Sequence, residues 1–475
     1  MNLSKHLQHR IFKTVSEVCA REKVSGFVVG GYVRDLLLDR PSVDIDFVIL
    51  GEGMSIAEKV AAELSAGPVV LYKNFGTAAF PFEGLDIEFV GARKESYDRN
   101  SRKPVVENGT LEDDQNRRDF TMNALAISLA GSSFGEVIDP FDGMADLQKK
   151  IIRTPLDPAI TFSDDPLRMM RAIRFATQLG FQIEKTALDA ITNGAERLDI
   201  ISAERITDEL NKIILADKPS VGFKLLFDTK LLHRFFPEMV LLQGVETRNN
   251  LSHKDNFYHT LEVLDNICRD SDNLWLRWAA ILHDIAKPKT KKFRDDTGWT
   301  FHGHEDVGER MTAGIFRKLK LPLDAKMKYV QKLVRLHLRP IALVNGEVTD
   351  SAVRRLLFEA GEDIEDLMTL CNADITSKNE YKVLRYRSNF LKVQDKLREV
   401  EAKDNVRNFQ PPITGEEIMA IFKLKPCREV GVLKNEIKEA ILEGTIRNDY
   451  AEAHDLLMKK AAELGITFKP TQGPN

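Results

Sequence analysis

The chain has few cysteines, no excess of basic charge and no long apolar run. Its four cysteines are scattered among 475 residues, at Cys19, Cys268, Cys371 and Cys427. This spacing excludes a zinc ribbon and a disulfide framework and indicates reduced thiols. A net charge of −4 gives no support for nucleic-acid binding by the chain as a whole, so any basic surface must be local.

Membrane and export signals are also absent from the sequence. No apolar run is long enough to span a bilayer, and the N-terminal segment lacks the apolar core of a signal peptide. We therefore expect a cytoplasmic protein that makes no membrane contact.

The length of the chain predicts several domains. Short apolar strands alternate with helices over the first 150 residues or so, with strands expected at 27–29, 43–49, 69–72, 77–82, 85–91 and 124–129 and helices near 3–22, 32–38 and 54–65. From about residue 157, helical periodicity dominates. The predicted fold class is therefore α+β, a small sheet domain followed by a long all-α region. The polar segment from Gly91 to Arg118 is long enough to predict a flexible functional loop.

The most informative stretch is residues 26–49, GFVVGGYVRDLLLDRPSVDIDFVI. Gly30 and Gly31 precede an expected helix, where glycines let a phosphate approach the backbone N–H groups. Asp44 and Asp46 are two apart on an expected strand, so their side chains project from the same face. Adjacent carboxylates repel unless a cation lies between them, and Mg²⁺ brings triphosphate oxygens with it. A Gly-Gly turn and a solvated strand edge are the plain alternatives, but Arg34 between the two pairs favours a triphosphate site.

The stretch GGYVRDLLLDRPSVDIDF resembles the catalytic signature of the tRNA nucleotidyltransferase and bacterial poly(A) polymerase family, within the DNA polymerase β-like superfamily. The resemblance implies that Asp44 and Asp46 are catalytic and hold Mg²⁺, and that Gly30, Gly31 and Arg34 bind the nucleotide. Such sites often have a third carboxylate. Glu88, on the strand expected at 85–91, is a candidate for it or else a structural charge.

A second motif, RRDFTMNALA, begins at Arg117. Arginine forks suit phosphate oxygens, although a surface arginine pair held by Asp113 or Asp114 would look the same. The motif resembles the family's second motif, which orients the triphosphate and sugar. The resemblance assigns nucleotide binding to Arg118, Asp119 and Asn123.

A third motif, DDPLRMMRAIRFATQLGF, starts at Asp164 and continues as a helix, with Asp164 as its expected N-terminal cap. Asp165 and Arg168 are three apart, which predicts neighbouring side chains. A carboxylate and a guanidinium would match the amino group and ring nitrogen of cytosine or adenine and would repel uracil and guanine. A helix-surface ion pair is the alternative. The segment resembles the family's templating motif, which implies that CTP and ATP are read by Asp165 and Arg168, with Arg171 and Arg174 also at the nucleotide.

Two further segments fit the same family. DPFDG, from Asp139, is similar to its hinge-like connecting motif, and SAERITDELNKIIL, from Ser202, is similar to its last shared motif. In the latter segment Glu209 reads as structural support through helix ion pairs.

A second cluster of candidate ligands lies further along the chain. Of 10 histidines, several fall near the dipeptide His283-Asp284, and imidazoles and carboxylates on neighbouring helices suit a pair of transition metals that activates water. The order resembles the HD phosphohydrolase superfamily. It implies a divalent transition metal of unknown identity held by His259, His283, Asp284, His304, His337 and Asp374. A degenerate domain with packed histidines is the alternative.

Together these patterns predict four parts: a nucleotidyltransferase head at 1–155, a neck with the nucleotide-reading helix at 156–225, an HD body at 226–410 and a tRNA-binding helical tail at 411–475. The resemblance implies addition of CCA to the 3′ end of tRNA from CTP and ATP, with release of pyrophosphate. It also implies an additional, metal-dependent phosphohydrolase activity of the HD domain. Three alternatives stay open. These are a poly(A) polymerase, an enzyme adding only A or only CC, and an RNA-binding protein in which only the HD site is active.

Overall fold

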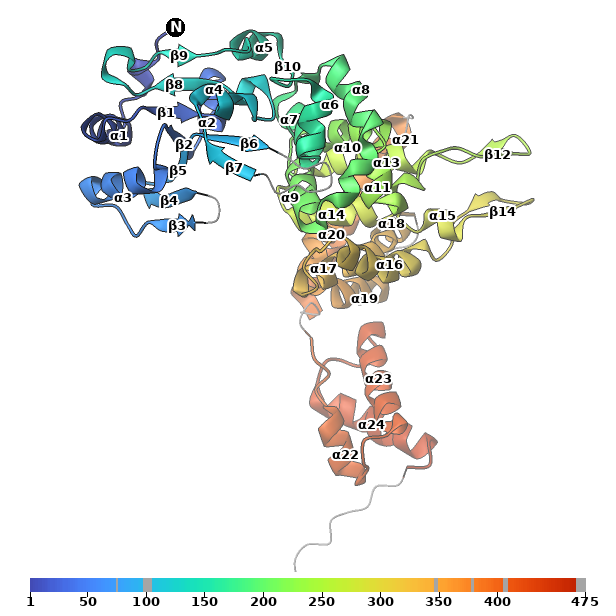
Figure 1. Ribbon diagram of the computed structural model, residues 1–475. Helices are drawn as coiled ribbons and strands as arrows, with labels where there is room; N and C mark the ends of the chain where they lie inside the picture. The colour runs from blue at the N-terminus through green and yellow to red at the C-terminus, as the bar shows by residue number, and fades with distance from the viewer. Residues whose placement is uncertain (74–75, 97–104, 346–348, 377–379, 405–408, 467–475) are drawn as a thin grey trace, which may run out of the picture. The chain divides into compact units, whose positions relative to one another are not determined.

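The computed structural model describes residues 1–73, 76–96, 105–345, 349–376, 380–404 and 409–466 (Figure 1). The chain forms two compact units, Met1–Val240 and Leu241–Asn475. The first contains a mixed sheet and helices, and the second is almost entirely helical. The predicted α+β fold class is confirmed. None of the helices in the described ranges combines the length and the apolar character needed to cross a membrane.

The first unit is built on a seven-stranded sheet with the order β3-β4-β5-β2-β1-β8-β9. Its strands are β1 (Gly26–Val29), β2 (Asp44–Ile49), β3 (Val70–Tyr72), β4 (Thr77–Phe82), β5 (Leu85–Gly91), β8 (Ala126–Ser128) and β9 (Val137–Ile138). β2 and β5 run parallel, and the other neighbours are antiparallel. The predicted strands of this region are confirmed to within two residues at each end.

Strand β2 has one wholly apolar face and one mixed face, because its side chains alternate. Phe47 on the apolar face stacks on Phe89 of β5 at a ring distance of 4.8 Å. Phe12 covers the same face from α1 (Arg10–Glu22). On the other face Val48 joins a buried apolar cluster, while Asp44 and Asp46 occupy the strand's beginning. The apolar end of this face packs into the core, and the acidic end carries Asp44 and Asp46.

Short helices complete the sheet domain: η1 (Ser4–His6), α2 (Gly31–Leu37), α3 (Gly53–Leu64), α4 (Leu111–Asn116), η3 (Thr121–Asn123), η4 (Gly131–Ser133) and α5 (Gly143–Lys149). The region from Gly91 to Arg118 is not the single loop that we expected. It contains the antiparallel pair β6 (Arg93–Ser96) and β7 (Val105–Asn108), followed by α4. Residues 97–104 of that predicted loop lie outside the described residues.

The remainder of the first unit is a helical layer. Its elements are β10 (Ile151–Ile152), α6 (Pro158–Asp164), α7 (Leu167–Leu179), β11 (Gln182–Ile183), α8 (Lys185–Asn193), η5 (Ala195–Ile200), α9 (Ala203–Ile214), α10 (Pro219–Asp228), α11 (Leu231–Phe235) and α12 (Pro237–Val240). The prediction that Asp164 caps the N-terminus of α7 was wrong. Asp164 is the last residue of α6, and the Asp165 carboxylate accepts the backbone N–H of Leu167 instead.

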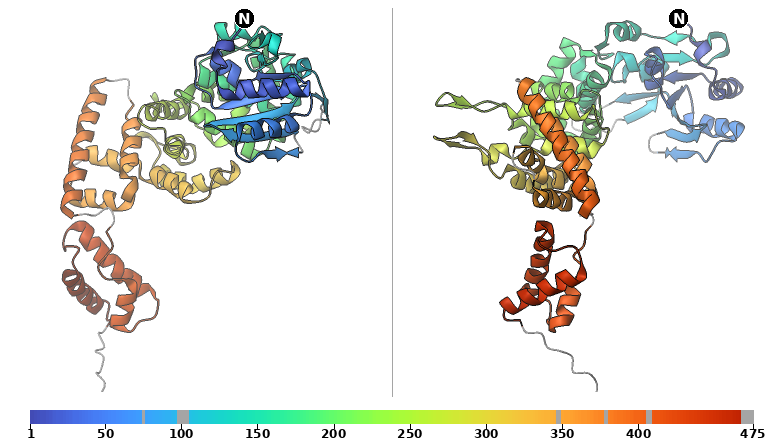
Figure 2. Two further views of the ribbon diagram at one scale, coloured as in Figure 1. Left: turned by 90° about the vertical axis from the view of Figure 1, so that its left-hand side faces the viewer. Right: turned by 180° about the vertical axis from the view of Figure 1, so that it is seen from behind.

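The second unit contains a largely buried helix, α14 (Leu274–Leu282), together with other helices. These are α13 (Asn256–Ile267), α15 (Lys287–Thr290), α16 (His304–Lys318), α17 (Ala325–Leu336), α18 (Leu338–Asn345), α19 (Asp350–Ala360), η6 (Gly361–Asp363), α20 (Ile364–Asp374), α21 (Glu380–Asp404), α22 (Gly415–Phe422), α23 (Arg428–Glu443) and α24 (Tyr450–Glu463). From Leu276 to Leu282 every α14 side chain is buried, and all are apolar except Arg277, which donates to the carbonyl of Ser271 and to Asp272. Helix α21, orange in Figure 2, packs against α18 and α19.

Two small antiparallel ribbons interrupt the helices of the second unit. One joins β12 (Thr247–Arg248) to β13 (Leu251–Ser252), and the other joins β14 (Lys292–Arg294) to β15 (Gly298–Thr300). Helical periodicity did not predict either ribbon, because each strand is too short to show an alternating pattern.

Candidate functional site

The turn between β1 and α2 brings the first and second predicted motifs together. Gly30 has a φ of +75°, a backbone conformation that glycine adopts without strain. A Cβ atom at Gly30 would lie 2.9 Å from Nη1 of Arg118 and 3.5 Å from Oδ2 of Asp46. Glycine at this position therefore lets the turn approach one member of the acidic pair and one predicted nucleotide-binding arginine.

Four carboxylates line the face of β2 and β5 that meets this turn. The parallel register pairs Asp44 with Asp86 and Asp46 with Glu88, so all four side chains leave the sheet on the same side. Burial raises the pKa of Asp46, Asp44 adds to the rise, and Arg118 partly offsets it. Burial and Asp46 likewise raise the pKa of Glu88. A cation at this face would relieve the repulsion, and oxygen-only ligands fit Mg²⁺.

Arg34, predicted to bind the nucleotide, lies in an interior network. Its guanidinium donates two hydrogen bonds to Asp35, at 2.9 and 2.7 Å, and one to Oδ1 of Asn123 at 2.9 Å. Asn123 in turn donates to Asp119 at 2.9 Å. The first and second motifs are thus joined by hydrogen bonds between side chains.

Arg117 and Arg118 share one fully buried carboxylate, that of Asp114. Asp114 is one of the two partners that we considered, whereas Asp113 caps α4 through a capping box with Thr110. Burial opposes ionisation of Asp114, but the two guanidinium groups lower its pKa below the ordinary value. The arginine pair is therefore anchored from inside the protein and is not a loose surface pair.

Asp119 connects the second motif to α7. Its Oδ2 atom accepts a hydrogen bond from Nε of Arg171 at 2.7 Å, and its Oδ1 atom accepts from the backbone N–H of Phe120. Burial works against ionisation, but Arg171 and Asn123 outweigh it and bring the pKa of Asp119 to about 2. This buried ion pair holds the start of the second motif against the helix of the third.

The structure does not pair Asp165 with Arg168. Asp165 has an extended backbone before α7 begins, and its carboxylate lies 3.3 Å from Nη2 of Arg205 on α9. Arg168 donates to the backbone carbonyls of Thr161, at 3.2 Å, and Arg117, at 2.5 Å. The prediction of adjacent side chains assumed a continuous helix and was wrong. Sequence reasoning missed the contact with Arg205 because 40 residues separate it from Asp165.

Three guanidinium groups surround the ring of Phe175 on α7. Those of Arg34, Arg171 and Arg174 lie 4.8, 5.4 and 4.0 Å from its centroid. Arg174 also donates to buried Glu209 of α9 at 2.5 Å, which confirms the structural reading of Glu209. Arg34, Arg171 and Arg174, all predicted to bind nucleotide, thus belong to one cluster that we call the Phe175 cluster.

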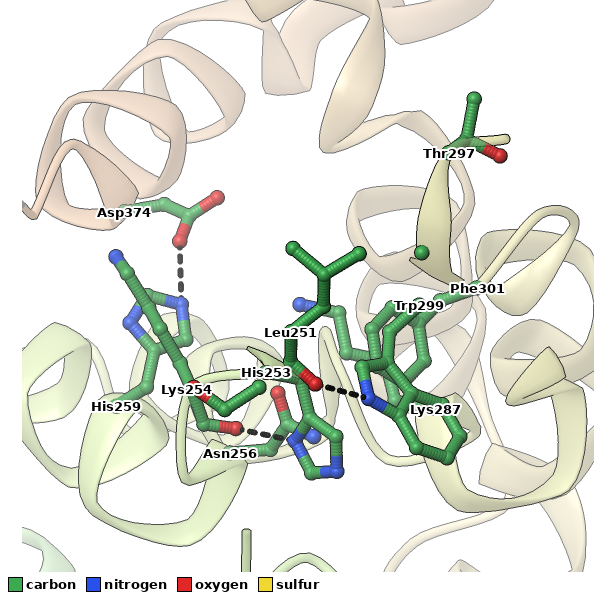
Figure 3. A pocket seen from close by; sticks show the side chains of 12 residues that line it. Leu251, His253, Lys254, Asn256, His259, Lys287, Thr297, Trp299, Phe301 and Asp374 are labelled. Carbon is green, nitrogen blue, oxygen red and sulfur yellow. Dashed lines mark hydrogen bonds and ion pairs between the residues drawn. The ribbon is translucent and has the colours of Figure 1, made fainter. Parts of the chain in front are cut away.

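The six predicted HD residues meet in the second unit, mostly at helix ends. His283 and Asp284 follow α14, His304 begins α16, His337 follows α17, and Asp374 ends α20. His259 lies inside α13, and its Nε2 atom is 2.9 Å from Asp374 (Figure 3). Helix ends place these side chains around one centre although 115 residues separate the first from the last.

Backbone carbonyls orient three of the imidazoles. The Nδ1 atoms of His283, His304 and His337 each donate to a carbonyl 2.7 Å away, those of Ala280, Phe301 and Val334. This orientation turns each Nε2 atom towards Asp284, at 3.2, 3.2 and 3.9 Å. Among the described residues, buried Nε2 of His283 has no hydrogen-bond partner. Outer partners of this kind fix the tautomer of metal-binding histidines.

Two sets of potential ligands share Asp284. One is His259, His283 and Asp284, the other is Asp284, His304 and His337, and within each set the ligand atoms lie within 4.8 Å of one another. Burial opposes ionisation of Asp284, but His283 and Lys287 lower its pKa well below the ordinary value. A buried carboxylate among several imidazoles fits a pair of divalent metal ions. Lys287, whose Nζ atom lies 2.5 Å from Asp284, was not identified from the sequence.

Comparison with known proteins agrees with both sites. The family models of the poly A polymerase head domain and the HD domain match residues 26–153 and 256–377. A model described as "Probable RNA and SrmB- binding site of polymerase A" matches residues 180–242. These matches, with the acidic strand pair, define a nucleotidyltransferase head combined with an HD domain.

The A-adding tRNA nucleotidyltransferase of Deinococcus radiodurans is 32% identical over 427 residues, which cover 87% of this chain and 90% of the relative. The multifunctional CCA protein of Pseudoalteromonas atlantica is 30% identical over 374 residues, covering 76% and 87%. The chain therefore belongs to the tRNA nucleotidyltransferase family of CCA-adding and A-adding enzymes.

Solved structures show the same fold. A CCA-adding enzyme in complex with CTP superposes with a TM-score of 0.62 at 22% identity, covering 96% of this chain and 95% of that one. The Thermotoga maritima CCA-adding enzyme in complex with tRNA gives a TM-score of 0.60 at 21% identity, covering 97% and 99%.

Replacing Asp119 with Asn should destabilise the first unit. A pKa lowered from 3.8 to about 2 corresponds to about 2 kcal/mol of unfolding free energy at pH 7. Because the folded-state pKa is lowered, this stabilisation is present above the unfolded-state pKa and is lost as the pH falls towards 2. Urea unfolding followed by circular dichroism should show wild type and variant converging as the pH is lowered.

Asp199 provides the matched control, since it forms an exposed ion pair with Arg234. Asp199→Asn should cost less than about 1 kcal/mol at every pH. If both substitutions lowered the free energy of unfolding equally, the Asp119–Arg171 pair would have no special role in stability.

Proposed function

We propose that the protein adds CCA to the 3′ end of tRNA from CTP and ATP, in the cytoplasm and without membrane contact. The 3′-hydroxyl oxygen of the RNA attacks the α-phosphorus, the new O–P bond replaces the bond to pyrophosphate, and the hydroxyl proton is released. The proposal rests above all on the convergence of Gly30, Asp46 and Arg118 at the acidic face of β2.

The residues of the first unit divide the work. Asp44 and Asp46 would hold Mg²⁺, with Glu88 opposite Asp46 as a further carboxylate. Mg²⁺ bound there supplies Lewis acidity at the attacking hydroxyl and at the leaving phosphates. Gly30 and Gly31 admit phosphate to the N-terminal end of α2, where backbone N–H groups favour anions. Arg118 adds positive charge beside them, while Asp119 and Asn123 keep Arg171 and Arg34 in place.

Base selection would fall to Asp165 and Arg168. Arg205 and the backbone N–H of Leu167 hold the Asp165 carboxylate in place, where it would accept from the amino group of the base. Two backbone carbonyls anchor Arg168 and align its guanidinium. Binding of uracil or guanine would place a ring N–H against this fixed N–H donor, which is unfavourable. Both bases of the CCA end present the same amino and ring-nitrogen pattern, so one pair of side chains would serve for both.

We divide these roles among a head at 1–155, a neck at 156–225, an HD body at 226–410 and a tail at 411–475 that contacts tRNA. The relative from Deinococcus radiodurans is named an A-adding enzyme, so addition of A alone is the second candidate.

The second proposed activity is hydrolysis of phosphate esters at the HD site. His259, His283, Asp284, His304, His337 and Asp374 would hold two divalent metal ions, whose Lewis acidity activates water. The support is the shared, buried Asp284 and the three imidazoles that direct Nε2 atoms towards it. Lys287 brings a positive charge to the same place, where a phosphate would bind.

Nucleotide addition is tested on tRNA that lacks its CCA end. We expect CTP alone to add two nucleotides, ATP alone to add none, and both together to add three. Asp46→Asn should lower the rate at least about a hundredfold, because the metal loses a carboxylate. Exposed Asp39 serves as the control, and Asp39→Asn should leave the rate unchanged.

Other outcomes of this assay would replace the proposal. Growth only of tRNA that already ends in CC would identify an A-adding enzyme, and long adenylate ladders would identify a poly(A) polymerase. Absence of incorporation would favour an RNA-binding protein.

Asp165→Asn should relax base selection. The amide can donate to the carbonyl of uracil or guanine, so the kcat/KM ratios of CTP over UTP and of ATP over GTP should fall roughly 10- to 100-fold. Single-turnover addition with each nucleotide measures these ratios. Asp189, exposed and paired with Lys185, provides the control Asp189→Asn. Unchanged ratios for Asp165→Asn would remove this residue from base selection.

Asp284→Ala should abolish metal-dependent hydrolysis at the HD site while nucleotide addition continues. Asp284 belongs to both ligand sets, so its loss should also release bound metal, measured by mass spectrometry of the purified protein. Nitrophenyl phosphate mono- and diesters serve as substrates. The control is exposed Asp306 on α16, replaced by Ala. Hydrolysis that survives in Asp284→Ala would refute the assigned site.

A further inference from the structure

A pocket opens beside the HD residues in the second unit. It has a volume of about 420 Å³, within the usual range for small-molecule sites. His259 and Asp374 form part of its lining, and the two small ribbons supply much of the remainder (Figure 3). Whatever binds here lies against the predicted metal ligands and against residues that have no role in holding metal.

Aromatic residues form the wall of the pocket that is contributed by the ribbons. Trp299 on β15 contacts His253 at a ring distance of 5.4 Å and Phe293 at 5.2 Å, both nearly edge to face. Its indole N–H donates to the carbonyl of Leu251 at 3.1 Å, which ties β15 to β13. The tryptophan ring is therefore held in one orientation while it lines the pocket.

Two backbone groups fix the orientation of the His253 ring. Its Nε2 atom accepts the backbone N–H of Glu246 at 3.2 Å, so Nδ1 must donate to the carbonyl of Lys254, 2.7 Å away. It also contacts Phe301 edge to face at 5.8 Å. The carbonyl of Phe301 holds His304, so the aromatic wall and the predicted metal ligands share one frame.

Two lysines lie between this wall and the HD residues. Lys287 contacts Asp284, and Lys254 donates to the carbonyl of Thr376 at 2.9 Å, next to the hydroxyl that meets His259. Ammonium groups at this position suit a phosphate, and a rigid tryptophan suits the flat face of a base. The order across the pocket is metal ligands, positive charge, then aromatic ring.

We propose that Trp299 is the base-stacking residue of a nucleotide subsite at the HD site, with Lys254 and Lys287 at the phosphate. The ligand class is a phosphate ester that bears a nucleobase, supplied as a free nucleotide or as the end of an RNA chain. This inference rests on the proposed HD function for its role in catalysis, but the binding itself does not depend on hydrolysis.

The test compares AMP with ribose 5-phosphate, which differs only by lacking the base. The full-length protein is titrated with each while tryptophan fluorescence is recorded. All three tryptophans lie in the second unit, at 275, 278 and 299, so the signal does not report nucleotide bound to the first unit. We expect saturable quenching by AMP that Trp299→Phe removes.

The affinities for AMP and ribose 5-phosphate are then measured by calorimetry, with each tryptophan variant made in the Asp46→Asn protein. Trp299→Ala should weaken AMP binding at the second unit about tenfold or more, as loss of one base-stacking ring does, and should leave ribose 5-phosphate unaffected. Trp299→Phe should restore AMP affinity to within about threefold. Half-buried Trp275, which contacts Phe316 and Lys326 outside the pocket, is the control, and Trp275→Ala should change neither ligand.

The outcomes separate the two proposals. Equal affinity for AMP and ribose 5-phosphate, or normal AMP binding by Trp299→Ala, would overturn the subsite while Asp284-dependent hydrolysis could still stand. If AMP and ribose 5-phosphate bind equally well and hydrolysis also continues without Asp284, both the subsite and the HD activity would be overturned. An oligoribonucleotide with a 3′-terminal phosphate that displaces AMP from Trp299 would identify RNA ends as the source, and failure to displace it would identify free nucleotides.

Discussion

The first unit depends on the Phe175 cluster, in which three guanidinium groups surround one ring and two of them pair with buried carboxylates. Arg171 pairs with Asp119, Arg174 with Glu209, and all lie within the packing of α7. A buried charge without its partner is costly, so each member requires the others. Through Arg34 and Asn123 the same network reaches the turn before α2. Helices α2 and α7 are consequently held as one framework.

In the second unit, backbone groups orient the buried polar side chains. Several imidazoles and two carboxylates lie close together with little solvent, which is unfavourable unless each is oriented and compensated. Carbonyls near helix ends hold three Nδ1 atoms, and Lys287 balances part of the charge on Asp284. Burial, with His283, lowers the pKa of His337 to about 4, so this imidazole is neutral at neutral pH.

Local patterns predicted most of the sheet and the residues of both sites. The two-residue period of β2 placed Asp44 and Asp46 on one face, because a buried strand leaves no other register. Contacts between distant segments were not predictable. Asp165 meets Arg205 and not Arg168, and Lys254 meets Thr376, since these pairs depend on how helices pack. The ribbon β14–β15 was missed because its strands are three residues long.

The sequence by itself determined the fold class, the chemical character of the acidic pair and the choice of the six candidate HD residues, because each follows from residue type and motif spacing. Only the tertiary structure decided that Gly30 meets Asp46 and Arg118, that Asp284 is shared between two ligand sets and that Trp299 lies beside them. The physical reason is that these arrangements arise from the packing of elements far apart in the chain, and local spacing carries no information about their separation.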